Sequence, residues 1–196
     1  SGTAITDTAE ITFETETSGN AEESTEPVGP TILRINSGGA EITFGDVTFL
    51  KDQYGDGPTF NFTNEFLTEV DSTEYDELFY TERVTKNDFP LEPFSYRIPV
   101  ENGTYSIKLY WAEVYWGIHP NGIDGGVGSR IFSVTMEGLP IITDIDLYEE
   151  LGPATADTRM YDVEVTDGEL TITFQSSVDR PKISGLEIFG NSPVIP

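Results

Sequence analysis

Short apolar runs separated by turn dipeptides are the feature of this sequence that most restricts its fold. Such dipeptides stand at residues 102–103, 137–138 and 167–168, as Asn-Gly, Glu-Gly and Asp-Gly. Because Asn-Gly and Asp-Gly favour tight turns, we predict hairpins around 102–103 and 167–168. Helical periodicity never lasts three turns, and only residues 144–151 are expected to form a helical turn, stopped by Gly152. The pattern predicts an all-β fold, an antiparallel β-sandwich.

The chain divides into an acidic N-terminal segment and one domain. Residues 1–30 hold seven acidic residues and no lysine or arginine, and two prolines close the segment. Within it, apolar and polar residues alternate over part of residues 5–17, as in an edge strand. We therefore predict that residues 1–30 form an acidic linker or an N-terminal edge strand. Residues 31–196 are predicted to form the β-sandwich domain, which is long enough to bury a sizeable core.

The charge of the chain excludes several classes of partner. It has 35 acidic and 10 basic residues and a net charge of -25. Phosphate groups would be repelled, which argues against nucleic acids and against anionic membrane surfaces. No run of 18 apolar residues is present, so we predict no membrane insertion. Neutral ligands and metal cations are compatible with this charge.

Metal sites have weak support in the sequence. The chain has no cysteine and one histidine, a composition that argues against a zinc site. Glycine-rich loops carry Asp52, Asp56 and Asp124, whose carboxylates are the oxygen ligands that calcium prefers. No EF-hand spacing surrounds them. We predict that the domain has no cofactor, and one structural calcium bound by these three residues is the alternative.

An almost continuous apolar run covers residues 105–116 and ends in two large aromatic residues, Tyr115 and Trp116. The run is too apolar to alternate cleanly, so we predict a central strand covered on both faces. A loop with five glycines follows over residues 117–128. Glycine lets the loop backbone approach another group closely. The aromatic pair therefore stands where a core strand passes into a loop.

Two polar residues in this region have both a structural and a functional interpretation. Glu113 lies inside the apolar strand, and a buried carboxylate needs a partner. Arg130 and Arg83 are the candidate partners, and we interpret Glu113 as structural. His119 follows in the glycine-rich loop, where it either contacts a ligand or is simply a loop residue.

Eight sequence motifs, in the same order, resemble those of the malectin-like carbohydrate-binding family. They stand at residues 34–39, 80–83, 96–105, 111–116, 130–138, 144–152, 167–172 and 181–188. No single motif is diagnostic, but eight in the right order are specific, and together they cover residues 31–190. The resemblance implies a jelly-roll-like sandwich that binds sugars and catalyses no reaction.

The resemblance also implies a set of site residues. In the animal protein that names the family, aromatic residues and one aspartate bind glucose disaccharides. The aromatic pair corresponds to Tyr115 and Trp116 here, and the aspartate corresponds to Asp179. An upstream aromatic residue corresponds to Phe60 or Phe62.

One position departs from the family pattern. A tyrosine directly after the Thr-Glu-Arg motif is replaced by Val84. Tyr80, just before that motif, either compensates for the loss or does not. The departure puts the family's sugar specificity in doubt for this chain.

The residue types fit the chemistry of a sugar. A flat aromatic ring covers the apolar C–H face of a pyranose, and a carboxylate accepts hydrogen bonds from its hydroxyls. Tyr115, Trp116 and Asp179 could supply both contacts. The alternative is that the two aromatic residues belong to the core and that Asp179 only forms a turn.

We predict a non-catalytic carbohydrate-binding module that recognises a neutral, glucose-type di- or oligosaccharide through loop aromatics. The candidate sugar-binding residues are Tyr115, Trp116, Asp179, Phe62, Tyr80 and His119. The module is expected to belong to a larger extracellular or cell-surface protein, bacterial in origin, with covalent neighbour domains. The alternative is a structural or adhesion spacer domain that has lost sugar binding. No enzyme is expected, because the chain lacks a Gly-x-Ser-x-Gly motif and its acidic residues are too numerous to indicate a glycosidase pair.

Overall fold

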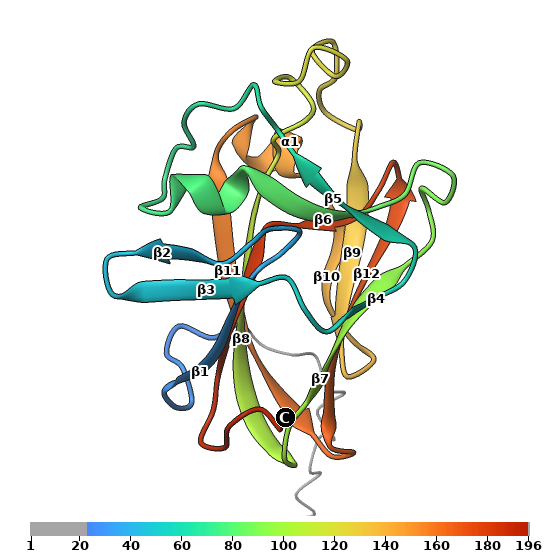
Figure 1. Cartoon of the computed structure of the whole chain (residues 1–196). Helices are drawn as coiled ribbons and strands as arrows, with labels where there is room; N and C mark the ends of the chain where they lie inside the picture. Colours follow the sequence, from blue (N-terminus) through green and yellow to red (C-terminus); the bar gives the residue numbers. More distant parts are fainter. Residues whose placement is uncertain (1–22, 196) are drawn as a thin grey trace, which may run out of the picture.

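Two large β-sheets face each other as a sandwich, and a third, smaller sheet crosses one end of it (Figure 1). The structure is a computed structural model that describes residues 23–195. The six-stranded sheet has the order β11 (Ala156–Val165), β8 (Gly103–Ala112), β14 (Gly185–Phe189), β1 (Thr31–Asn36), β3 (Val47–Lys51) and β2 (Ile42–Phe44). The five-stranded sheet has the order β10 (Leu139–Ile145), β9 (Ile131–Met136), β12 (Glu169–Val178), β7 (Phe94–Pro99) and β4 (Gly55–Asp56). The small sheet has the order β13 (Lys182–Ile183), β6 (Thr81–Thr85) and β5 (Thr59–Thr63).

The hydrophobic core fills the space between the two large sheets. Trp111 of β8 meets Phe132 of β9 edge to face, with the ring centroids 5.9 Å apart, and Phe174 of β12 is fully buried in the same cluster. A second cluster joins Tyr110 of β8 to Phe79 of the short 3-10 helix η1 (Asp76–Phe79). The structure thus confirms the predicted all-β class and the antiparallel sandwich.

Strand β8 is the central strand that the apolar run predicts. It pairs antiparallel with β11 on one side and with β14 on the other. Most of its side chains are buried, because the five-stranded sheet covers one face and η1, with residues packed beside it, covers part of the other. The strand leads directly to Glu113 and the aromatic pair.

The hairpins predicted at residues 102–103 and 167–168 are wrong. β7 pairs with β4 and β12 in the five-stranded sheet, whereas β8 lies in the six-stranded sheet, so residues 102–103 connect the two sheets. Residues 167–168 do the same between β11 and β12. The two connections lie side by side, since the Val100 N–H donates to the Gly168 carbonyl at 3.1 Å. Of the three turn dipeptides, the one at 137–138 alone joins two strands that pair with each other, β9 and β10.

The single predicted helical turn is confirmed as α1 (Leu147–Leu151). The side chain of Asp146 caps its first turn by accepting the N–H groups of Tyr148 and Glu149. Gly152 ends it with a φ of 80°, a left-handed conformation that favours glycine. Within residues 23–195, no helix has the length and apolar character needed to cross a membrane.

The last part of the acidic segment runs from β11, the edge strand of the six-stranded sheet, to β8, the next strand. The Ser24 N–H donates to the Met160 carbonyl at 2.7 Å, and the Val28 N–H donates to the Ser106 hydroxyl at 2.9 Å. A groove of about 340 Å³ separates this segment from β8 and β11. The edge strand predicted for residues 5–17 lies outside the described residues.

Candidate functional site

Five rings gather where β8 passes into the glycine-rich loop, and we call Phe62, Phe66, Tyr115, Trp116 and His119 the aromatic cluster. Tyr115 lies 5.1 Å from Trp116 and 5.9 Å from Phe62, in both cases edge to face. The imidazole of His119 stacks on Tyr115 at 4.8 Å, and Phe66 meets His119 at 5.1 Å. Phe66 is exposed and the other four rings are half-buried, outside both core clusters. Tyr115 and Trp116 are therefore not core residues.

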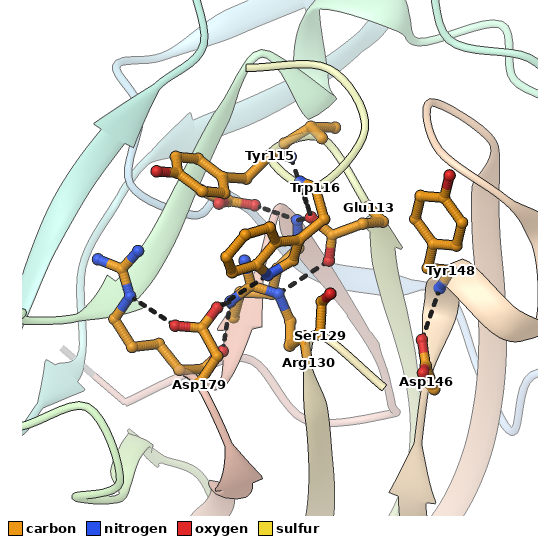
Figure 2. A network of polar contacts seen from close by, with 12 residues as sticks. Glu113, Tyr115, Trp116, Ser129, Arg130, Asp146, Tyr148 and Asp179 are labelled. Carbon is orange, nitrogen blue, oxygen red and sulfur yellow. Dashed lines mark hydrogen bonds and ion pairs between the residues drawn. The ribbon is translucent and has the colours of Figure 1, made fainter. Parts of the chain in front are cut away.

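The carboxylate of Glu113 holds the backbone of the aromatic pair. One of its oxygens, Oε1, accepts the N–H groups of Tyr115 at 2.9 Å and Trp116 at 3.1 Å, as Figure 2 shows. The other oxygen accepts from Arg130 Nε at 2.8 Å. Arg130 is thus confirmed as the predicted partner of Glu113. The alternative partner, Arg83, instead pairs with Asp52 at 2.7 Å, because β6 carries it toward the other side of the small sheet.

The side chain of Trp116 is held by a second carboxylate, that of Asp179. Its Oδ2 accepts from the indole Nε1 at 3.1 Å and pairs with Arg130 at 3.1 Å (Figure 2). Its Oδ1 accepts from Arg180 Nε at 3.3 Å. Arg130 therefore links the two carboxylates that fix the backbone and the ring of Trp116.

Asp179 also has an uncommon backbone conformation. Its φ is 56°, in the left-handed region that residues other than glycine seldom adopt. Such strain costs on the order of 1 kcal/mol or more and concentrates at functional sites. The turn that the sequence allowed at Asp179 is therefore real, and the same turn aims the carboxylate at Trp116.

Two glycines of the loop make room for the aromatic pair. A Cβ atom at Gly122 would lie 2.8 Å from ring atoms of Tyr115, and one at Gly125 would lie 2.2 Å from the Trp116 ring. Both rings therefore pack directly on bare backbone. The sequence indicated that this loop approaches some group closely, and the group proves to be the protein's own aromatic pair.

The structure separates the other candidate residues. Phe62 contacts Tyr115, whereas Phe60, the alternative upstream aromatic, lies under the guanidinium of Arg180 at 5.9 Å. Tyr80 donates its hydroxyl to the Thr68 carbonyl and packs against the second core cluster. In the described part of the chain, its ring has no aromatic contact with the cluster.

The three weak calcium candidates do not come together. Asp52 pairs with Arg83 and accepts from the Tyr96 hydroxyl, while Asp56 lies 3.6 Å from Arg97. Asp124 lies exposed in the glycine-rich loop. Among residues 23–195, no group of three histidine, cysteine, aspartate or glutamate side chains could hold a metal ion. A calcium ion stays a prediction without an assembled set of ligands.

Two parts of the site had no signal in the sequence. Asn64 is almost fully buried and joins the turn before Phe66 to the end of β8, because its side chain donates to the Val114 carbonyl. Arg130 pairs with Asp179, which lies 49 positions later in the chain. A buried asparagine and a long-range ion pair leave no local pattern from which they could be predicted.

The pKa of Glu113 gives the site a specific acid sensitivity. Burial raises the pKa of this carboxyl, but Arg130, Lys182 and the Tyr115 N–H outweigh burial and lower it from 4.5 to about 2. A carboxyl with a depressed folded-state pKa stabilises the fold above its unfolded pKa and loses this contribution as the pH falls toward the folded value. The contribution should therefore disappear between about pH 4.5 and pH 2.

We expect that loss to be about 3 kcal/mol, since each pKa unit is worth about 1.4 kcal/mol. Because many other carboxyls titrate in the same range, the measurement is a comparison with Glu113→Gln, which keeps an acceptor but has no titrating group. The difference in unfolding free energy between the two proteins should shrink from pH 4.5 to pH 2. A difference that stays constant over this range would contradict the assignment.

Comparison with known proteins decides the family. The profile of the Malectin domain matches residues 31–186. The chain belongs to the malectin domain family. Its curated relatives include malectin from Mus musculus, 26% identical over 182 residues, which span 82% of this chain and 57% of that protein. Malectin from Homo sapiens is 25% identical over the same coverage. The chain thus spans little more than half the length of these relatives.

Solved structures support the same fold at lower identity. The ANX2 ectodomain from Arabidopsis thaliana superposes on this malectin-family chain with a TM-score of 0.65 and 18% identity. The match covers 85% of this chain and 50% of the ANX2 chain. A beta-glucuronidase from Bacteroides uniformis matches 81% of this chain, with a TM-score of 0.66 and 19% identity, but the match covers only 18% of the enzyme. At these identities the likeness establishes the fold alone.

Proposed function

We propose that this domain is a non-catalytic carbohydrate-binding module for a neutral, glucose-type di- or oligosaccharide. Membership in the malectin domain family and the aromatic pair Tyr115 and Trp116 after the end of β8 support this proposal. The domain would act within a larger extracellular or cell-surface protein that carries covalent neighbour domains. Binding through one shallow site would be weak, about 1 mM to 1 μM, or about 4–8 kcal/mol.

The observation that carries the proposal is the way Trp116 is held at the surface. Its backbone is fixed by Glu113 and its indole by Asp179, although the ring remains half-buried and outside the core. Two carboxylates and a buried arginine are a costly arrangement for positioning one surface ring. A ring held in one orientation loses little entropy when a sugar binds to it.

A spacer domain without sugar binding is the second candidate, and two observations favour it. Val84, at the position of the family tyrosine, is buried in β6 and offers no ring to a ligand. The carboxylate of Asp179 already has three partners, namely Trp116, Arg130 and Arg180. Its remaining capacity to accept a sugar hydroxyl is correspondingly small.

The test is a glycan array followed by titration of each hit with the variant Trp116→Ala. We expect the variant to bind at least about tenfold more weakly, which is about 1.4 kcal/mol, because the indole supplies the main apolar contact. Phe44→Ala is the matched control, since Phe44 is a half-buried ring at the far edge of the six-stranded sheet. Both variants should melt cooperatively, which separates loss of binding from loss of the fold.

The array also separates the candidates. An array without any hit would favour the spacer domain. A hit whose titration is the same in wild type and Trp116→Ala would place the sugar elsewhere on the domain. Turnover of a hit glycan would contradict the proposed absence of catalysis.

A further inference from the structure

Phe66 is an exposed aromatic ring that is not among the proposed sugar-binding residues. It lies in the segment after β5, and 54% of its surface is exposed. Its ring meets His119 at 5.1 Å and nearly at right angles. His119 in turn stacks on Tyr115. Phe66 therefore continues the aromatic cluster away from Trp116 and Asp179.

The backbone around Phe66 is held firmly, in spite of the exposure of the ring. The Phe66 N–H donates to the side chain of Asn64 at 2.9 Å. Asn64 is itself buried, donates its amide to the Val114 carbonyl, and donates its N–H to the Tyr80 carbonyl at 3.0 Å. Val114, the residue before Tyr115, is thus linked through Asn64 to the backbone of Phe66. Because Phe66 adjoins His119 and Tyr115, it extends a continuous group of rings, and such contiguous apolar patches, unlike single exposed residues, mark binding surfaces.

His119 places one polar group beside this ring. Its Nδ1 accepts the N–H of Asn121 at 3.1 Å, so the neutral imidazole carries its proton on Nε2. The loop backbone holds the residue, because the His119 N–H donates to Tyr115 and its carbonyl accepts from Gly122. Within residues 23–195, Nε2 has no hydrogen-bond partner and is available as a donor. A hydrogen-bond donor next to an apolar ring matches the two faces of a sugar.

We propose that Phe66 and His119 form a second sugar-binding surface, continuous with the one at Trp116, so that the domain binds a chain of three or more sugar units. The proposal rests on the proposed function. The occupant follows from continuity: Trp116, Tyr115, His119 and Phe66 succeed one another at centroid spacings of 5.1, 4.8 and 5.1 Å. A disaccharide at Trp116 would leave Phe66 in water, whereas a longer chain would cover it.

The experiment measures the affinity of the intact domain for a ladder of α- and β-linked gluco-oligosaccharides, from disaccharide to hexasaccharide, by calorimetry. We expect the wild-type affinity to rise from two units to three or four and then level off. In Phe66→Ala the disaccharide affinity should be unchanged, while the longer ligands should bind about 5- to 10-fold more weakly than to wild type. Phe66→Tyr, which keeps the flat ring, should retain the wild-type dependence on length.

Leu139→Ala is the control for removing an exposed apolar side chain, because Leu139 is 39% exposed at the start of β10, next to the turn that joins β10 to β9. It should change no affinity in the ladder. Affinity that is independent of length in wild type would overturn the second surface and leave the first intact. So would an equal loss for all ligands in Phe66→Ala, or a loss in Phe66→Tyr. If no member of the ladder binds wild type, the proposed function fails for glucose chains and the extension fails with it.

Discussion

Arg130→Leu is expected to destabilise the domain by about 3–5 kcal/mol, because it removes the one cation that two carboxylates share. The arginine is 3% exposed and lies 2.8 Å from Glu113 and 3.1 Å from Asp179. Leucine has no charge and would leave the Glu113 carboxylate in an apolar surrounding with a single cation, Lys182, at 3.9 Å. Urea unfolding of wild type and variant at pH 7 measures the loss.

The matched control is Arg159→Leu. Arg159 also pairs with two carboxylates, those of Glu150 and Asp157, but its side chain is partly exposed. An ion pair in contact with water is worth about 1 kcal/mol or less, so this variant should lose correspondingly little. If Arg130→Leu lost no more than Arg159→Leu, the buried network would not stabilise the fold as described.

Arg130→Leu should also affect the candidate sugar site, because Arg130 pairs with Asp179, the carboxylate that accepts the hydrogen bond of the Trp116 indole. Without Arg130, the ion partner that Asp179 keeps among residues 23–195 is Arg180. Glu113 would still accept the backbone N–H groups of the aromatic pair. The stability of the domain and the position of its surface ring therefore depend on one group of charges.

The class of fold could be predicted from local patterns, since these are set by neighbouring residues. The apolar run at 105–116 is a buried central strand up to Ala112, and the helical turn ends at Gly152 as expected. Each of these features can be predicted from the spacing of apolar residues or from one residue that ends a helix. Patterns of this kind survive folding because tertiary contacts reinforce them.

The pairing of strands could not be predicted in the same way. Asn-Gly at 102–103 and Asp-Gly at 167–168 do reverse the chain, but the following strands enter the opposite sheet. A turn dipeptide fixes the local backbone, whereas the choice of partner strand depends on which faces can be buried together. In a sandwich these partners come from distant parts of the chain: β8 pairs with β11 and β14.

The candidate site shows the same limit. The end of an apolar strand identified Tyr115 and Trp116, and the cost of burying a carboxylate identified Arg130 as a partner of Glu113. The resemblance placed Asp179 near them, and the structure places it against Trp116. No local rule could reveal that Asp179 is shared by two arginines, since those contacts arise only when the loops meet.

Removing the lysine of a second buried ion pair is expected to destabilise the domain as much as Arg130→Leu does. Lys182 is fully buried, and its Nζ lies 2.5 Å from Glu82 and 3.9 Å from Glu113. Lys182→Met has a similar volume but no charge, so Glu82 would remain as a buried carboxylate without its cation. We expect a loss of about 3–5 kcal/mol in unfolding free energy at pH 7.

The double variant Lys182→Met with Glu82→Gln decides whether this loss comes from charge. Removing both members of a buried pair costs much less than removing one, because no uncompensated charge remains. The double variant should therefore recover at least half of the stability that Lys182→Met loses. Lys86→Met, at an exposed lysine, should change stability by no more than about 0.5 kcal/mol. A double variant as unstable as the single one would mean that the packing of the lysine stem, and not its charge, stabilises β13 against β6.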